Sequence, residues 1–180
     1  MKKALVIYSS KYGHTEKYAG WIAEELKADI CNVKGFNRNR IKDYDVIILG
    51  GGLYAGNING IKIIVNNYEK IKDRKIVLFS CGLADCNKIE NINSINKRLE
   101  ETVPRNILEN IKVFNLRGGI NYNGLTWIHK MMMKLVKKMV MKKGLDKLNE
   151  MEKGFMETYG KTIDFTDKDN IKGIIDYCKS

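Results

Sequence analysis

Proline is nearly absent from this chain, with one residue in 180, which argues against long interdomain linkers. Long apolar runs are lacking as well, and no stretch reaches the roughly 20 uninterrupted apolar residues of a membrane span. The apolar run at residues 4–8 is too short for a signal peptide, and no small-residue cleavage site follows it. We expect one globular domain over residues 1–180, located in the cytoplasm or peripherally on the inner face of the cell membrane.

Cysteine is sparse and carries no recognisable motif. Of Cys31, Cys81, Cys86 and Cys178, only Cys81 and Cys86 are close, and their C-x4-C spacing fits neither a zinc knuckle nor a C-x-x-C redox pair. They are either buried thiols or a redox pair beside a cofactor. Because no metal-ligand cluster or Ser-His-Asp set appears, we expect no metal and no catalytic side chain, so that the chemistry belongs to a cofactor.

Negative charge is also in deficit, since 32 Lys and Arg residues face 21 Asp and Glu residues and the net charge is +11. Such a chain attracts an acidic protein, an acidic lipid surface, a negatively charged substrate or nucleic acid. The lysines gather in one segment without the interleaved aromatic residues that stack on bases. We therefore expect no nucleic-acid partner.

What is present is an alternation of strand and helix patterns. Short apolar runs predict strands at residues 4–8, 30–33, 46–49, 75–79 and 111–116. Helical spacing predicts helices at residues 15–26, 61–71, 89–99 and 171–177, the first with Thr15 as its N-cap. The alternation predicts a doubly wound α/β fold with five parallel strands, whose ligands bind outside the carboxyl ends of the strands.

The loop between the first strand and the first helix has the composition of an anion site. Its residues are Ser9, Ser10, Lys11, Tyr12, Gly13, His14 and Thr15. Backbone N–H groups and the helix dipole converge there, the hydroxyls add donors, and Gly13 permits a close backbone approach. Neither a Walker A lysine nor G-x-G-x-x-G is present. A serine-rich turn with no ligand has a similar composition, so the loop alone is moderate support for a phosphate site.

Two further glycine-rich loops follow the third and fourth strands, at residues 51–57 and 80–85. Parallel strands place all three loops along one edge of the sheet. A flat tricyclic ring requires backbone amides at its polar rim and apolar groups on its faces, which Leu53, Tyr54 and Leu83 supply. The three loops together favour FMN.

At this point the chain resembles the flavodoxin family. Residues 9–15 match that family's S/T-x-x-x-G-x-T phosphate signature, and the order of elements extends the resemblance over nearly the whole chain. Residues 8–15, 50–56 and 116–119, followed by Tyr122 and a helix at 127–139, look most similar to the branch that includes menaquinone-dependent protoporphyrinogen oxidase. The resemblance implies strand order 2-1-3-4-5, helices on both faces, and a helical insert after the first half of the fifth strand.

The resemblance also implies the cofactor, FMN, and its contacts. The phosphate contacts would come from Ser9, Lys11, Tyr12, Gly13, His14 and Thr15. The ring contacts would come from Leu53, Tyr54 and Gly56 on one side, from Ser80, Cys81, Gly82, Leu83 and Asp85 on another, and from Gly118 and Gly119 at the rim. His14 either pairs with the phosphate or is an exposed loop residue, and His129 is expected to be a surface residue.

Residues 121–160 are too long for a loop and contain a basic helix at 126–143, so they are predicted to be an insert within the domain. The helix is amphipathic. Its apolar face comprises Trp127, Ile128, Met131, Met132, Leu135, Val136, Met139 and Val140, and its lysines are Lys130, Lys134, Lys137, Lys138, Lys142 and Lys143. This helix either lies on an anionic membrane surface, packs on the domain or forms a homodimer interface.

Two functions fit these features. The first is an FMN-dependent, protoporphyrinogen oxidase-like oxidoreductase that passes electrons between a donor, such as a porphyrinogen, and a quinone or similar acceptor. The second is a non-enzymatic electron carrier or redox-binding module that docks an acidic protein partner. The resemblance implies that carriers in the flavodoxin family are acidic, whereas this chain is basic.

Overall fold

The central sheet of the protein is built from five parallel strands. The computed structural model describes residues 2–54 and 57–180. The strands are β1 (Ala4–Ser9), β2 (Asp29–Asn32), β3 (Val46–Tyr54), β5 (Lys75–Gly82) and β6 (Lys112–Arg117), and their order is β2-β1-β3-β5-β6. A short strand, β4 (Asn57–Ile58), pairs antiparallel with the end of β3. Counted along the chain, the five long strands have the predicted order 2-1-3-4-5, so the predicted fold is confirmed.

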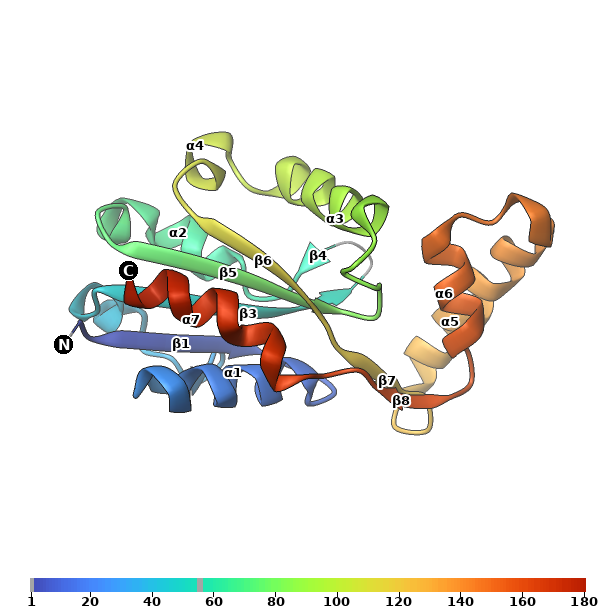
Figure 1. Ribbon diagram of the computed structural model, residues 1–180, viewed down its shortest axis with the longest axis horizontal. Coiled ribbons are helices and arrows are strands. Elements are labelled where there is room, and N and C mark those ends of the chain that lie inside the picture. Colours follow the sequence, from blue (N-terminus) through green and yellow to red (C-terminus); the bar gives the residue numbers. More distant parts are fainter. Residues whose placement is uncertain (1, 55–56) are drawn as a thin grey trace.

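Helices cover both faces of this sheet (Figure 1). On one face lie α1 (His14–Leu26) and α7 (Lys172–Lys179), which the 3-10 helix η3 (Lys168–Ile171) precedes. The other face carries α2 (Lys62–Ile71), α3 (Ile89–Thr102), α4 (Arg105–Leu108) and the 3-10 helix η1 (Arg38–Asp43). Successive strand side chains enter opposite cores, which explains the continuous apolar runs: Leu5 and Ile7 face α2, whereas Val6 faces α1.

Three predicted boundaries shift for physical reasons. Helix α1 begins at His14 and its N-cap is Gly13, so the prediction of Thr15 as N-cap is wrong. Strands β3 and β5 continue through glycines that were predicted to end them. Gly50 pairs with Phe79 in the parallel ladder, and a Cβ on Gly50 would lie 2.1 Å from the Phe79 ring. This glycine therefore makes room for a core side chain within a strand.

The predicted insert is enclosed by an antiparallel ribbon. Strand β7 (Gly119–Asn121) extends the line of β6 and pairs with β8 (Thr162–Asp164). Between them lie α5 (Trp127–Lys142), the 3-10 helix η2 (Leu145–Lys147) and α6 (Glu150–Thr158). Figure 1 shows α5 and α6 side by side, beyond the edge of the sheet where the strands end. Among the helices that the structure describes, none is long and apolar enough to cross a membrane.

Candidate cofactor site

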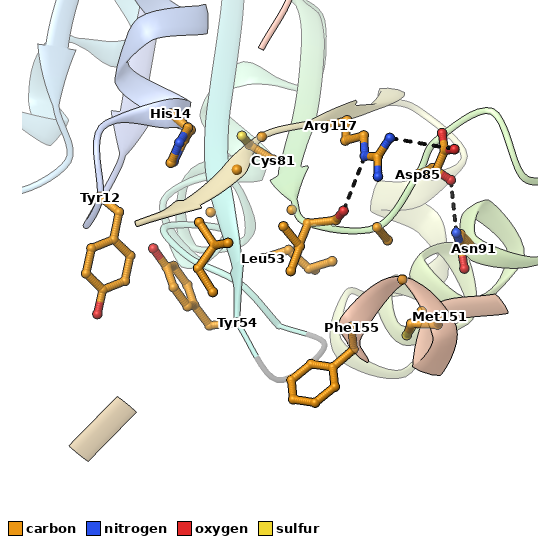
Figure 2. Close-up of a pocket in the computed structure, with 18 of the residues that line it drawn as sticks. Tyr12, His14, Leu53, Tyr54, Cys81, Asp85, Asn91, Arg117, Met151 and Phe155 are labelled. Carbon is orange, nitrogen blue, oxygen red and sulfur yellow. Dashed lines mark hydrogen bonds and ion pairs between the residues drawn. The ribbon is translucent and has the colours of Figure 1, made fainter. Parts of the chain in front are cut away.

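A cavity of about 520 Å³ opens at the carboxyl ends of the strands. Its walls come from the carboxyl ends of β3, β5 and β6, from the loops that follow β1, β5 and β6, and from both helices of the insert. Figure 2 shows the strand-end side of the cavity together with Met151 and Phe155 of α6. The volume lies within the range of roughly 300–1,000 Å³ that is common for small-molecule and cofactor sites. Ligands of doubly wound sheets bind at this position, outside the carboxyl ends of the strands.

The loop after β1 is shaped to receive an anion. Gly13 has φ +92°, a left-handed conformation that turns the chain into α1. The Gly13 N–H donates to Ser10 Oγ at 3.0 Å, and no side chain caps the helix. The N–H groups of the first turn of α1 therefore keep their hydrogen-bonding capacity and the positive end of the helix dipole. This donor set fits the phosphate of a cofactor.

The predicted loop residues divide into two groups. Ser10, Tyr12, His14 and Thr15 line the cavity, whereas Ser9, Lys11 and Gly13 do not. The Thr15 side chain is buried and lies beside the Cys81 thiol. Ser10 is therefore the serine hydroxyl that reaches the cavity at the helix N-terminus, and it is partly buried.

Most of the predicted ring contacts are brought together at the cavity. The residues that line it are Leu53, Tyr54, Cys81, Gly82, Leu83, Asp85, Gly118 and Gly119. Ser80 is placed elsewhere, because its buried hydroxyl lies 2.6 Å from Asn115 Oδ1, to which it donates. It alternates with Cys81 along β5 and so faces away from the cavity. Gly56 lies outside the described residues.

Gly118 and Gly119 allow close packing where the ribbon begins, against β5, β8 and the start of α1. A Cβ on Gly118 would lie 2.7 Å from Cys81 Sγ, and a Cβ on Gly119 would lie 2.3 Å from the Ile163 carbonyl oxygen and 2.6 Å from His14 Nε2. His14 is directed at the ribbon, with Nε2 3.9 Å from Asp164 Oδ1. Burial lowers the pKa of His14, although Asp164 opposes the shift. The neutral His14 ring thus packs between helix and ribbon.

Sequence reasoning missed a group that holds the β5–α3 loop in place. Arg117, at the end of β6, lies with Nη1 3.7 Å from Asp85 Oδ2, and its guanidinium stacks on Phe165 with 3.7 Å to the ring centroid. Asn91 Nδ2 donates to the Asp85 carbonyl at 3.0 Å. Figure 2 shows these contacts around Asp85. The position of Arg117 at the carboxyl end of a predicted strand was the available signal.

The insert forms one wall of the cavity, which periodicity did not indicate. Its lining residues include Leu125, His129, Met132, Met133, Val136, Met151 and Phe155. His129 is partly buried, and its Nδ1 lies 2.5 Å from the Tyr12 hydroxyl. The expectation that His129 is merely a surface residue is therefore wrong. On the other side of the cavity, Lys88 forms an ion pair with Glu150 of α6.

The rings of Tyr12, Tyr54 and His129 lie close together where the insert meets residues 9–15, the loop expected to bind phosphate and called the phosphate loop below. The Tyr12 and Tyr54 centroids are 6.2 Å apart, and those of Tyr54 and His129 are 6.0 Å apart. Burial raises the pKa of Tyr54 to about 12, so its hydroxyl stays protonated in mildly alkaline solution as well as at neutral pH. The trio provides aromatic surface at the mouth of the cavity, and the Tyr54 hydroxyl is a hydrogen-bond donor.

The fold and the site define a doubly wound α/β protein with a donor-rich loop before α1 and an aromatic, glycine-rich cavity at the strand ends. Residues 5–149 match the flavodoxin domain family, and the chain belongs to this family. FMN is the cofactor of flavodoxin domains, in agreement with the expected cofactor.

Individual proteins match this chain either over less than half of its length or at low sequence identity. The chain is 40% identical over 81 residues to an uncharacterised protein of Methanocaldococcus jannaschii, a match covering 43% of this chain and 53% of that protein. The chain thus spans about half of that relative. It is 20% identical over 144 residues to protoporphyrinogen IX dehydrogenase (quinone) of Escherichia coli K12, which covers 76% and 80% of the two chains. Oxidised flavodoxin 2 from Bacillus cereus aligns with a TM-score of 0.43 and 21% identity, over 64% of this chain and 84% of that one.

Proposed function

We propose that this protein is an FMN-dependent oxidoreductase that passes electrons between a large, mainly hydrophobic donor, such as a porphyrinogen, and a quinone or similar acceptor. The observation that carries the proposal is the wall of the cavity supplied by the insert. That wall places methionine and aromatic side chains opposite the loops expected to hold the FMN ring. A substrate in such a cavity would lie against the ring.

The FMN phosphate would be held by Ser10 and by the first-turn amides of α1, and the ring by the loops that carry Leu53, Tyr54 and Gly82. When bound, FMN supplies the electron-transfer chemistry. The protein provides position and exclusion of water. The Tyr54 hydroxyl is protonated at neutral pH, as in any tyrosine of ordinary or raised pKa, and is available to donate a hydrogen bond at the ring or substrate.

The substrate class follows from the lining of the insert. Met132, Met133 and Met151 give an adaptable apolar surface, and Phe155 adds an aromatic face. Such a surface suits a large hydrophobic molecule better than a small polar one. The relative in Escherichia coli is named for a porphyrinogen and a quinone, which supports the same class at 20% identity.

Cofactor binding is tested first by adding FMN to the purified protein and recording its absorbance spectrum. Ser10→Ala should weaken FMN binding, since Ser10 lines the cavity, while Ser9→Ala, one residue away and outside the lining, is the matched control. Loss of one hydrogen bond to a charged group is worth about 1.5–3 kcal/mol, or roughly 10-fold to 100-fold in affinity. Equal affinities for the two variants would place the phosphate elsewhere.

Turnover is tested anaerobically with protoporphyrinogen IX as donor and a soluble quinone as acceptor. Phe155→Ala should raise the KM for the donor and leave FMN affinity unchanged. Met141→Ala, on an exposed side chain away from the cavity, should change neither quantity. Protein that is loaded with FMN but is never reduced by the donor would contradict the enzyme proposal.

An electron carrier that docks an acidic protein is the second candidate. It is favoured by the charge of α5, because this helix contains five lysines and no acidic residue. The two functions differ in one measurement. Bound FMN that exchanges electrons rapidly with a flavoprotein reductase, and not with any porphyrinogen or quinone, would support the carrier.

A further inference from the structure

Helix α5 carries a broad apolar face that nothing in the described part of the chain covers. Trp127 is 71% exposed, Met131 and Leu135 are each 59% exposed, and Met139 is 57% exposed. These positions, together with Ile128 and Met132, lie on one side of the helix at i, i+4 spacing. We name these six residues the α5 apolar face. Only Val140 is buried in the helix, so most of this stripe does not pack against the described part of the domain.

A row of cations borders the α5 apolar face. Lys134, Lys138 and Lys142 follow one another at four-residue intervals, and all three are exposed. Within the described residues, no carboxylate pairs with any of the lysines inside α5. The apolar stems of such lysines extend along a hydrophobic surface while their ammonium groups reach the polar layer above it.

We propose that α5 docks this protein on the surface of an anionic lipid bilayer. The helix has 16 residues and no described helix can span a membrane, so α5 would lie in the plane of the interface with its apolar face inward. The lysine row would then meet the anionic headgroups. The net charge of +11 adds long-range attraction to the same surface.

Charge decides between lipid and a second copy of the chain. Two α5 faces brought together would place their lysine rows close to one another without any acidic residue from either helix. An anionic bilayer instead neutralises the row and accepts the apolar side chains at once. Figure 1 shows α5 and α6 projecting away from the sheet, which leaves the domain clear of the docked surface.

Docking would also change how substrates reach the cavity. This part of the inference rests on the proposed function. Met132 belongs both to the α5 apolar face and to the cavity lining, and its neighbour Val136 also lines the cavity. A docked helix therefore brings one wall of the cavity to the lipid interface. A lipid-dissolved quinone or porphyrinogen would reach the cavity from the bilayer without crossing water.

The test is co-sedimentation of the full-length protein with vesicles of phosphatidylcholine alone and of phosphatidylcholine mixed with phosphatidylglycerol. We expect the anionic vesicles to bind at least tenfold more protein, and salt to reduce this binding, because each lysine near the surface contributes roughly fivefold. The measurement is made with and without FMN. Docking is expected in both, so failure of the cofactor proposal would not mimic failure of docking.

Two variants and one control locate the surface. A variant with Lys134→Gln, Lys138→Gln and Lys142→Gln should lose most of the preference for anionic vesicles. Leu135→Ser with Met139→Ser should lower binding to both vesicle types, and circular dichroism checks that these variants stay folded. The control, Lys62→Gln with Lys97→Gln and Lys179→Gln, removes the same charge from exposed lysines that make no ion pair among the described residues.

Three results would overturn the proposal. The first is equal binding to neutral and anionic vesicles, and the second is an equal loss in the control variant. The third is a stable dimer in analytical ultracentrifugation that Leu135→Ser with Met139→Ser abolishes, because the face would then belong to a second copy.

Discussion

The hydroxyl of Tyr12 lies 2.5 Å from Nδ1 of His129, although 117 residues separate the two in the sequence. Lys11 Nζ is 3.3 Å from the other ring nitrogen of His129. Since the ammonium group only donates, Nε2 accepts from Lys11 and the neutral ring donates from Nδ1 to the Tyr12 oxygen, a tautomer inferred from these partners. The contact joins the insert to the phosphate loop.

This contact should weaken in acid. Burial and the charge of Lys11 both lower the pKa of His129 below 6.5, so the folded protein favours the neutral ring. The contribution of this contact is therefore complete above about pH 6.5 and is lost as the pH falls through the lowered pKa. We expect hydrogen-exchange protection factors in α5 to fall below that pH.

His129→Gln is the control for this prediction. The variant keeps polar contact with the loop and cannot titrate, so α5 should show no matching loss of protection in acid. His14, whose pKa burial also lowers, stays in both proteins and its contribution cancels. If α5 in the variant loses hydrogen-exchange protection in acid as the parent does, the contact between Tyr12 and His129 is not the cause of the pH dependence.

Gly13→Ala should weaken FMN binding and stability together. Gly13 has φ +92°, and an L-residue in the left-handed region costs about 1–2 kcal/mol. A shift of the loop to relieve that strain would move Ser10 and the helix amides, and we expect the FMN dissociation constant to rise about tenfold or more. Gly20→Ala in the same helix is the matched control, because a Cβ there meets nothing within 4 Å. It should keep FMN affinity and raise stability by up to about 1 kcal/mol.

Gly119→Ala should strain the pairing of β7 with β8 inside the ribbon. The added Cβ would lie 2.3 Å from a backbone oxygen, which cannot swing aside as a side chain does. Overpacking of this kind costs about 1–3 kcal/mol, measurable as a lower midpoint in urea unfolding. Gly154→Ala in α6, where a Cβ has open space, should be neutral or stabilising. A midpoint for Gly119→Ala equal to that of the parent would show that the ribbon is more loosely packed than described.

Cys81 and Cys86 should react slowly with iodoacetamide in the native protein. Burial raises the pKa of Cys81 to about 12 and that of Cys86 to about 11, so little thiolate is present at pH 8. Mass spectrometry after labelling should show both thiols unmodified until denaturant is added. Fast labelling of Cys81, or a Cys81–Cys86 disulfide formed by mild oxidation without unfolding, would favour the redox pair instead.

The local patterns of the chain predicted its elements well, because a strand such as residues 4–8 or a helix such as α1 is set by near-neighbour periodicity. Glycines were less informative. Gly13 marks a left-handed turn, whereas Gly50 sits inside a strand because Phe79 occupies the space above it. The sequence alone does not separate these two uses, since one depends on backbone conformation and the other on a neighbouring strand.

By itself, the sequence determined the alternating elements, the parallel sheet, the serine- and glycine-containing loop before α1 and the amphipathic character of α5. Only the tertiary structure decided that α5 leaves most of its apolar face exposed, that Ser80 faces away from the cavity, and that His129 reaches Tyr12. The physical reason is the distance along the chain over which each feature is set. Periodicity records which side of an element is apolar, while the partner of that side depends on how β7 and β8 orient the insert, a geometry set by pairing across about 40 residues.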